Sequence, residues 1–244
     1  MQRFDDDGEQ AIESVMRKKG FSTHGGAFTS PASSNFRHCV REIRASYAVV
    51  DILQKRAATT FDSGDAQHEK MLLEFWRLAK PNETLRNRIS DQWQTIGFQG
   101  KDPATDFRGM GLLGLDNLIY YARHHPKSFQ RVLEISHHPT AWFSMSIVGI
   151  NITGFVLELA RKGKLQLFFY TFGSSENTFG EVYSYIFDGF AQFWDAQHGI
   201  TVMDFSRMFK MFQGVVKLDI ATMRRPTLLG YTEEEDGGEE KKRL

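Results

Sequence analysis

The sequence predicts an all-α protein with a single compact multi-helix domain. Apolar residues recur at helical spacing through most of the chain, and proline and glycine divide these stretches into lengths typical of helices. Residues 165–172, LQLFFYTF, have the composition of a strand, but no second segment resembles a partner strand. Because a lone strand has nowhere to place its backbone hydrogen bonds, a helix or an extended core segment is expected there.

The predicted domain spans residues 36–225, between two disordered tails. Residues 1–35 begin with an acidic patch and continue into GFSTHGGAFTSPASSN, which lacks apolar periodicity. A flexible tail is expected there, with at most a short helix near Ile12 and Met16. Residues 226–244 end in EEEDGGEEKKRL, which is expected to be a charged, solvated C-terminal tail.

Three helices are expected in the first part of the domain. Residues 36–61 form the first, because their apolar side chains recur at helical spacing. Ser63 or Asp65 can cap the second, which ends before Pro81 because proline cannot continue a helix. A third helix is expected at residues 82–96, where leucine, isoleucine and tryptophan form an apolar stripe.

The second part of the domain is expected to hold five more helices. Residues 110–122 carry an inner face of leucine and isoleucine, and a short helix around Phe129 follows. Proline starts the next helix, at residues 139–161, and glycine is placed to end it. Residues 176–195 and 201–216 are amphipathic, with phenylalanine and methionine on the faces expected to be buried.

One of these helices could be mistaken for a membrane span. Residues 140–157 contain no charged side chain and are nearly long enough to cross a bilayer. They include serine, asparagine and threonine, and no second candidate accompanies them. A helix that is apolar all round is also typical of the centre of a helical domain, so a buried core helix and no direct membrane span are expected.

Composition limits the classes of partner and compartment. Lys plus Arg balance Asp plus Glu, 30 against 30 in 244 residues, so net charge suggests neither a nucleic-acid nor an acidic-membrane partner. The lone Cys39 excludes an internal disulfide and a cysteine-based zinc site. Since the first residues also lack the features of a signal peptide, a cytoplasmic protein is expected.

Residues 93–121 combine features with different physical roles. Pro103 cannot lie inside a helix, so a new helix is expected to begin after Asp106 and to place Arg108 at or just inside its N-terminus. The positive end of a helix disfavours a guanidinium there. Arg108 is therefore interpreted either as an ion-pair partner, for Asp106 or a neighbouring carboxylate, or as a side chain presented to a partner's anionic site. Gly109 and Gly111 leave room for another backbone to approach.

The sequence contains partial matches to catalytic and cofactor-binding motifs, but their context does not support them. Residues 109–114 read G-x-G-x-x-G, but the dinucleotide fingerprint needs a preceding strand, which this sequence does not supply. The histidine pairs at 124–125 and 137–138 are adjacent residues that point about 100° apart on a helix, so no metal site is expected. No nucleophile elbow, phosphate-binding loop or suitable carboxylate pair is found either, so the chain has no recognisable active site of its own.

The segment 93–121 resembles, in order and spacing, the signature of the ELMO domain. The matching residues are Trp93, Gly97, Phe98, Gln99, Pro103, Thr105, Asp106, Phe107, Arg108, Gly109, Gly111, Leu115 and Leu118. The resemblance continues through residues 147–153 and on to about residue 212. It covers most of the predicted domain.

The resemblance implies a GTPase-activating protein for Arf-family or Arf-like small GTPases. In such proteins the signature arginine is regarded as catalytic, so the resemblance implies that Arg108 acts as an arginine finger in trans. It implies no cofactor of the chain's own, since GTP and Mg²⁺ belong to the partner GTPase, which would also bring the protein to a membrane. Asp106 is expected to orient Arg108 or cap a helix, while Trp93 and Phe107 pack the loop. Gln99 either positions the attacking water or bonds to the loop's own backbone.

A second interpretation is a non-catalytic ELMO module. The larger engulfment-and-motility scaffolds share the domain and are described as lacking the signature arginine, which is present here as Arg108. In this interpretation the domain binds a small GTPase or a scaffold partner without accelerating hydrolysis, and Arg108 forms a structural ion pair.

Overall fold

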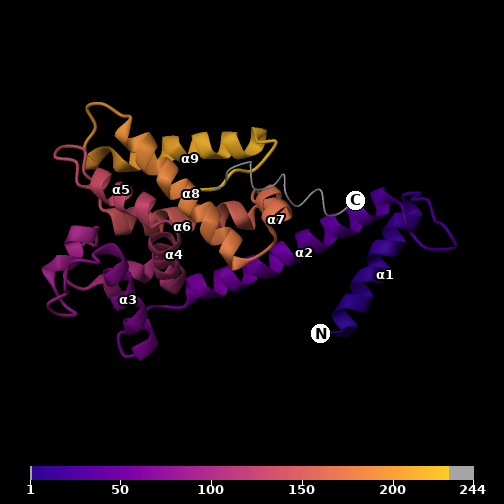
Figure 1. Cartoon of the computed structure of the whole chain (residues 1–244), viewed down its shortest axis with the longest axis horizontal. Coiled ribbons are helices and arrows are strands. Elements are labelled where there is room, and N and C mark those ends of the chain that lie inside the picture. Colours follow the sequence, from indigo (N-terminus) through magenta and orange to yellow (C-terminus); the bar gives the residue numbers. More distant parts are fainter. Residues whose placement is uncertain (1, 231–244) are drawn as a thin grey trace.

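The computed structural model describes residues 2–230, and the side chains of residues 8–230. Within these residues the chain is helical and contains no β-strand (Figure 1). The elements, with η for a 3₁₀ helix, are α1 (Gln2–Lys18), α2 (Pro31–Ala58), α3 (Ala66–Ala79), η1 (Asp91–Ile96), η2 (Pro103–Arg108), α4 (Gly111–His124), α5 (Pro126–Ser136), α6 (Met145–Arg161), α7 (Gln166–Phe172), α8 (Glu176–Asp195), η3 (Val202–Asp204) and α9 (Phe205–Thr222). The all-α prediction is confirmed.

One large core joins most of these helices. α4 lies at its centre, because it packs against α2, α3, α6 and α8. α6, which holds residues 145–157 of the uncharged segment, is buried along most of its length, and a Cβ atom on its Gly149 would lie 2.6 Å from Leu118 of α4. The buried-core interpretation of this segment is therefore confirmed. Among the described residues, none of the helices has the length and hydropathy that a membrane span requires.

α7 confirms the helix prediction for the strand-like segment. Phe168 and Phe169 are buried in the core, and the Gln166 side chain hydrogen-bonds Ser46 of α2, with Nε2 3.0 Å from Oγ. The contact with α2, far away in sequence, explains why this aromatic-rich segment forms a helix and not a strand.

The helix predicted at residues 82–96 is wrong. Residues 81–90 form an irregular loop, and η1 alone is helical. Side chains satisfy the loop's backbone in place of helical hydrogen bonds. Trp76 Nε1 donates to the Glu83 carbonyl at 2.9 Å, and Gln92 Oε1 accepts from the Arg86 N–H at 2.8 Å.

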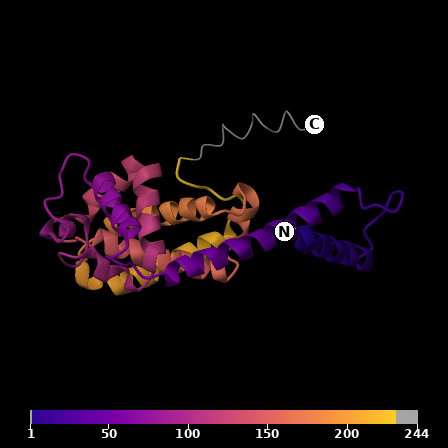
Figure 2. The same ribbon diagram turned by 90° about the horizontal axis from the view of Figure 1, so that it is seen from below.

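The flexible tail predicted at residues 1–35 contains α1 and the start of α2. α1 packs against the first half of α2, and Ile12, Met16 and Phe28 form a small cluster apart from the main core. α1 buries few apolar side chains, and it is stabilised by packing against Phe36 and Val40 of α2. The apolar spacing within residues 1–35 does not reveal this contact. Figures 1 and 2 both show α1 and the N-terminal half of α2 projecting from the body of the domain.

The C-terminal boundary also differs from the prediction. Pro226 and Leu228, expected in the charged tail, are buried, and Leu228 belongs to the main core. Residues 231–244, which hold most of the predicted tail, lie outside the described residues.

Candidate functional site

Buried aromatic rings hold the segment between α3 and α4. Trp93 packs edge-on against Trp76 of α3, with ring centroids 5.2 Å apart, and against Phe98 at 5.7 Å. Phe98 in turn packs against Phe107 at 5.7 Å. All of these rings are buried. They attach η1 and η2 to the body of the domain and fix the path of the chain between them.

Two glycines permit close backbone contacts around this aromatic cluster. Gly97 has φ +85°, and a Cβ atom there would lie 2.1 Å from the Met145 nitrogen at the start of α6. Gly111 has φ +48°, and its Cβ would lie 2.3 Å from the Thr59 carbonyl oxygen just after α2. The backbone that approaches Gly111 therefore belongs to this chain. At Gly109 there is open space, since a Cβ atom would meet nothing within 4 Å.

The start of η2 is held by a capping residue and an ion-pair bridge. Asp102 caps η2 by accepting from the Ala104 N–H, and Pro103 follows as its first residue. Arg88 donates to Asp102 Oδ1 at 2.8 Å and to Glu69 Oε2 of α3 at 2.5 Å. The sequence did not identify Arg88, because its two carboxylate partners lie 14 and 19 residues away and follow no local pattern.

Arg108 is the last residue of η2 and precedes α4, so it is near a helix start, as predicted, but outside it. Its side chain is exposed, and its Nε donates to the Thr105 carbonyl at 2.8 Å. Among the side chains of residues 8–230, no carboxylate forms an ion pair with it. The guanidinium is therefore held at one nitrogen and keeps its outer donors available to solvent.

Asp106 connects the two sides of the segment. Its Oδ2 accepts from the Gln99 N–H at 2.9 Å, so it bonds to the loop, while Asp102 caps η2. Burial raises the pKa of the Asp106 carboxyl, and the bond from Gln99 and the charge of Arg108 partly oppose this rise. Gln99 has an exposed side chain with no hydrogen bond to residues 8–230. Thr105 is exposed as well.

Replacing Arg108 with alanine is expected to raise the pKa of Asp106 further, because a charge that favours the carboxylate is removed. Since the folded protein already holds this proton more tightly than the unfolded chain, Asp106's contribution to stability falls as pH rises through its acidic titration range. The substitution steepens that fall. NMR titration of the Asp106 carboxyl tests this, with the exposed Arg77→Ala as control; an unchanged or lowered pKa contradicts it.

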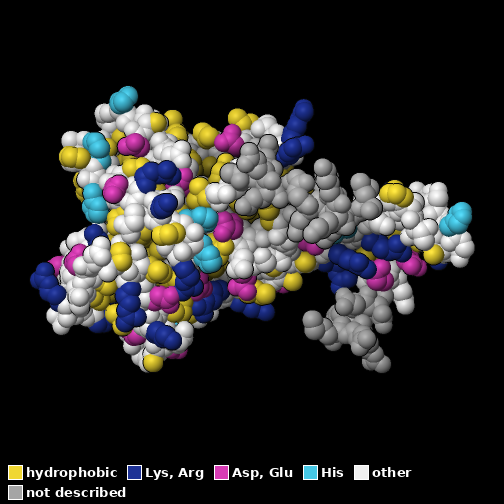
Figure 3. Space-filling model, viewed as in Figure 1, with side chains coloured by type: hydrophobic (Ala, Val, Ile, Leu, Met, Phe, Trp, Pro, Cys, Tyr) yellow, Lys and Arg dark blue, Asp and Glu magenta, His cyan; other side chains and the backbone are white. Residues whose placement is uncertain are grey.

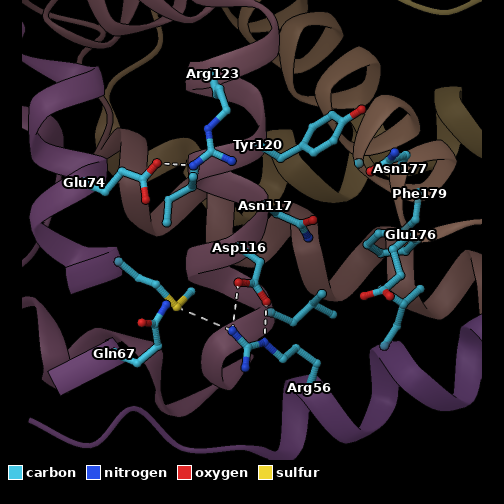
Figure 4. A pocket seen from close by; sticks show the side chains of 15 residues that line it. Arg56, Gln67, Glu74, Asp116, Asn117, Tyr120, Arg123, Glu176, Asn177 and Phe179 are labelled. Atoms are coloured by element: carbon cyan, nitrogen blue, oxygen red, sulfur yellow. Dashed lines mark hydrogen bonds and ion pairs between the residues drawn. The ribbon is translucent and has the colours of Figure 1, made fainter. Parts of the chain in front are cut away.

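A second candidate site is a pocket of about 490 Å³ between α2, α3, α4 and α8. Its charged groups are largely paired with one another (Figure 4). Arg56 donates to both carboxylate oxygens of Asp116, at 2.5 and 3.0 Å, and Arg123 pairs with Glu74. The bond to Asp116 raises the pKa of Arg56. These two arginines form ion pairs that join helices, whereas the Arg108 side chain bonds to a backbone carbonyl of its own segment.

The histidine pairs have partners within the chain. His125 Nε2 lies 2.9 Å from Glu181 Oε2, and His137 Nε2 lies 2.9 Å from the Thr95 carbonyl oxygen. In the part of the chain that the structure describes, no group of His, Cys, Asp and Glu is arranged to hold a metal ion.

Comparison with known proteins places this arrangement in a family. The pattern that defines the ELMO/CED-12 family matches residues 51–209, which include η1, η2 and Arg108. The chain belongs to the ELMO/CED-12 family. It is 35% identical to ELMO domain-containing protein B of Dictyostelium discoideum over 208 residues, covering 85% of this chain and 72% of that protein.

Animal members of the ELMO/CED-12 family are similar to the same extent. Mouse ELMO domain-containing protein 2 is 35% identical over 219 residues, which cover 86% of this chain and 71% of the mouse protein. Human ELMO domain-containing protein 1 is 34% identical over 233 residues, which cover 84% of this chain and 69% of the human protein. The resemblance of the signature is thus confirmed at the level of the family.

Proposed function

We propose that this ELMO/CED-12 protein is a GTPase-activating protein for an Arf-family or Arf-like small GTPase, and that Arg108 is its arginine finger. One observation carries the proposal. Arg108 is an exposed arginine without an ion-pair partner among residues 8–230, yet its backbone belongs to a segment held by buried aromatic rings and close glycine contacts. A charged group on a preorganised segment can enter a partner's site at little conformational cost.

The chemistry needs no cofactor from this chain. Water attacks the γ-phosphorus of GTP in the partner, and negative charge develops on the transferred phosphoryl group and the leaving oxygen. A guanidinium supplied in trans neutralises this charge and accelerates hydrolysis by roughly 10³ to 10⁵, which corresponds to about 4–7 kcal/mol of barrier. The partner supplies GTP and Mg²⁺, and it also brings this cytoplasmic protein to a membrane.

Arg108 depends on its neighbours for position. Its Nε bond to the Thr105 carbonyl directs the guanidinium relative to η2, and Asp106 ties η2 to the loop at Gln99. Trp93 and Phe107 are buried in the aromatic cluster, so they hold the segment in place and do not contact a partner. The structural ion pair that a purely binding module would need at Arg108 is not found among residues 8–230.

Phosphate release from a panel of GTP-loaded Arf-family and Arf-like GTPases tests the proposal. The full chain is added in excess under single-turnover conditions, and binding to each GTPase is measured in parallel. Faster γ-phosphate release from at least one member of the panel is expected. Binding without acceleration anywhere on the panel would instead assign a non-catalytic interaction module.

The Gln99 side chain is the one candidate in this loop for positioning the attacking water. It is exposed and its amide is not bonded to residues 8–230, so it is free to reach a partner. If it orients the water, Gln99→Ala is expected to slow single-turnover hydrolysis by roughly 10²-fold or more, as loss of a positioned polar group does. Hydrolysis at the wild-type rate excludes that role, and Gln10→Ala, at an exposed glutamine on α1, serves as the control.

A further inference from the structure

The outer face of α9 carries large apolar side chains that no part of residues 8–230 covers. Met211, Val215 and Leu218 lie on one side of the helix at helical spacing, and they are 50%, 46% and 64% exposed. Met203, just before the helix, is 87% exposed. Figure 3 shows hydrophobic side chains along the upper edge of the molecule, where α9 lies in Figure 1. A contiguous apolar stripe of this kind marks an interaction surface.

The opposite face of α9 fixes the helix on the domain. Met208, Phe212 and Val216 are buried, and the Phe209 ring packs against Phe155 of α6 with centroids 6.3 Å apart. The exposed stripe is therefore not needed to hold α9 in place. It also lies beyond residue 209, where the match to the family pattern ends.

Positive charge flanks the apolar stripe. Lys210, Lys217, Arg224 and Arg225 are exposed and form no ion pair with the side chains of residues 8–230. Lys217 lies over the Phe155 ring, 5.5 Å from its centroid, so the end of α6 is next to it. There the hydrogen bond from Lys162 lowers the pKa of Glu158, and the charges of Lys162, Lys217 and Arg161 lower it further. Asp219 is the acidic residue on the exposed side of α9.

We propose that the outer face of α9 binds the surface of an anionic lipid bilayer. Met211, Val215 and Leu218 would enter the headgroup region, while the flanking lysines and arginines contact lipid phosphates and carboxylates. This combination of an apolar face with adjacent lysine and arginine is what interfacial helices use. The chain as a whole is neutral, so this affinity arises from the segregation of charge in the fold.

A second copy of the chain is a poorer occupant of this face. A stable protein interface buries about 1,200–2,000 Å² in total, more than one short stripe on a single helix provides. Two copies related by a two-fold axis would also bring the Lys210, Lys217 and Arg224 charges of both copies to one interface, where each copy offers a single acid on the exposed side of α9, Asp219. A bilayer with anionic lipids supplies the opposite charge and needs no matching shape.

Co-sedimentation with lipid vesicles tests the proposal and requires no GTPase, so its result is independent of the proposed activity. The full chain is mixed with vesicles of phosphatidylcholine alone or of phosphatidylcholine with phosphatidylserine. Binding to the anionic vesicles only, weakened by salt, is expected. Met211→Glu with Leu218→Glu is expected to lower the partition coefficient at least about tenfold. Lys210→Gln and Arg224→Gln are each expected to lower it roughly fivefold.

The matched control places the same charges on another exposed apolar pair. Ile43 and Tyr47 of α2 are 43% and 56% exposed, and Ile43→Glu with Tyr47→Glu is expected to leave vesicle binding unchanged. No binding of the folded protein to anionic vesicles overturns the proposal, as does an equal loss in the control. A wild-type dimer that Met211→Glu with Leu218→Glu converts to a monomer would assign the face to a second copy instead.

Discussion

Replacing Arg108 with lysine is expected to abolish nearly all of the stimulated GTP hydrolysis while the protein remains folded. Lysine keeps the positive charge but loses the planar fork that contacts two phosphate oxygens at once. The expected loss is roughly 10³ to 10⁵ in the single-turnover rate with the responding GTPase, the range that arginine fingers contribute. Binding to the GTPase is expected to change far less, because the effect belongs to the transition state.

The fold is expected to tolerate this substitution because Arg108 is exposed and its side chain makes one hydrogen bond, to the Thr105 carbonyl. Melting temperatures of the two proteins should therefore agree. Arg77→Lys, an exposed arginine on α3, serves as the control and should retain the full rate. If Arg108→Lys keeps the wild-type rate, Arg108 is not the finger. If it chiefly lowers the melting temperature, the residue is structural.

Gly97→Ala is expected to destabilise the domain by at least about 3 kcal/mol, because a side chain at a positive φ and a forced overlap in a packed region each cost of the order of 1–3 kcal/mol. The new Cβ would lie 2.1 Å from the Met145 nitrogen and 2.7 Å from the Ser144 carbonyl carbon, and backbone atoms cannot rotate away as a side chain can. The Ile147 N–H also donates to the Gly97 carbonyl at 3.3 Å. Urea unfolding measures the loss.

Gly109→Ala is the matched control within the same segment. Gly109 has φ −79°, and a Cβ atom there would meet nothing within 4 Å. The free energy of unfolding of the Gly109→Ala variant is therefore expected to differ from that of the wild type by no more than about 0.5 kcal/mol. Similar losses in Gly97→Ala and Gly109→Ala would contradict the role assigned to the contact between η1 and α6. Because Gly109 is exposed beside Arg108, the stable variant also reports whether a partner approaches the backbone at that point.

Periodicity along the sequence was sufficient for the fold class and for the helices with long apolar stripes. α6 and α8 were predicted because their stripes repeat over many residues, and each repeat depends only on neighbouring residues of the same helix. The same local reasoning failed at residues 82–96. There the Gln92 and Trp76 side chains bond to the backbone of residues six and seven positions away, in place of the hydrogen bonds that a helix would have made along its own backbone.

For the candidate site, too, the sequence predicted one part and the tertiary structure decided the rest. The sequence alone singled out Arg108, since an arginine near a predicted helix start between proline and glycine is unusual on electrostatic grounds. Only the tertiary structure decided that Arg108 lacks an ion-pair partner among residues 8–230, that Asp106 bonds to Gln99, and that Gly97 meets α6. Residues 97 and 145 become neighbours only when the chain folds back on itself, and local patterns carry no record of such contacts. The sequence thus determined the fold class, most of the helices and the choice of Arg108 as the candidate residue, while packing between distant segments determined how that residue is held and left exposed.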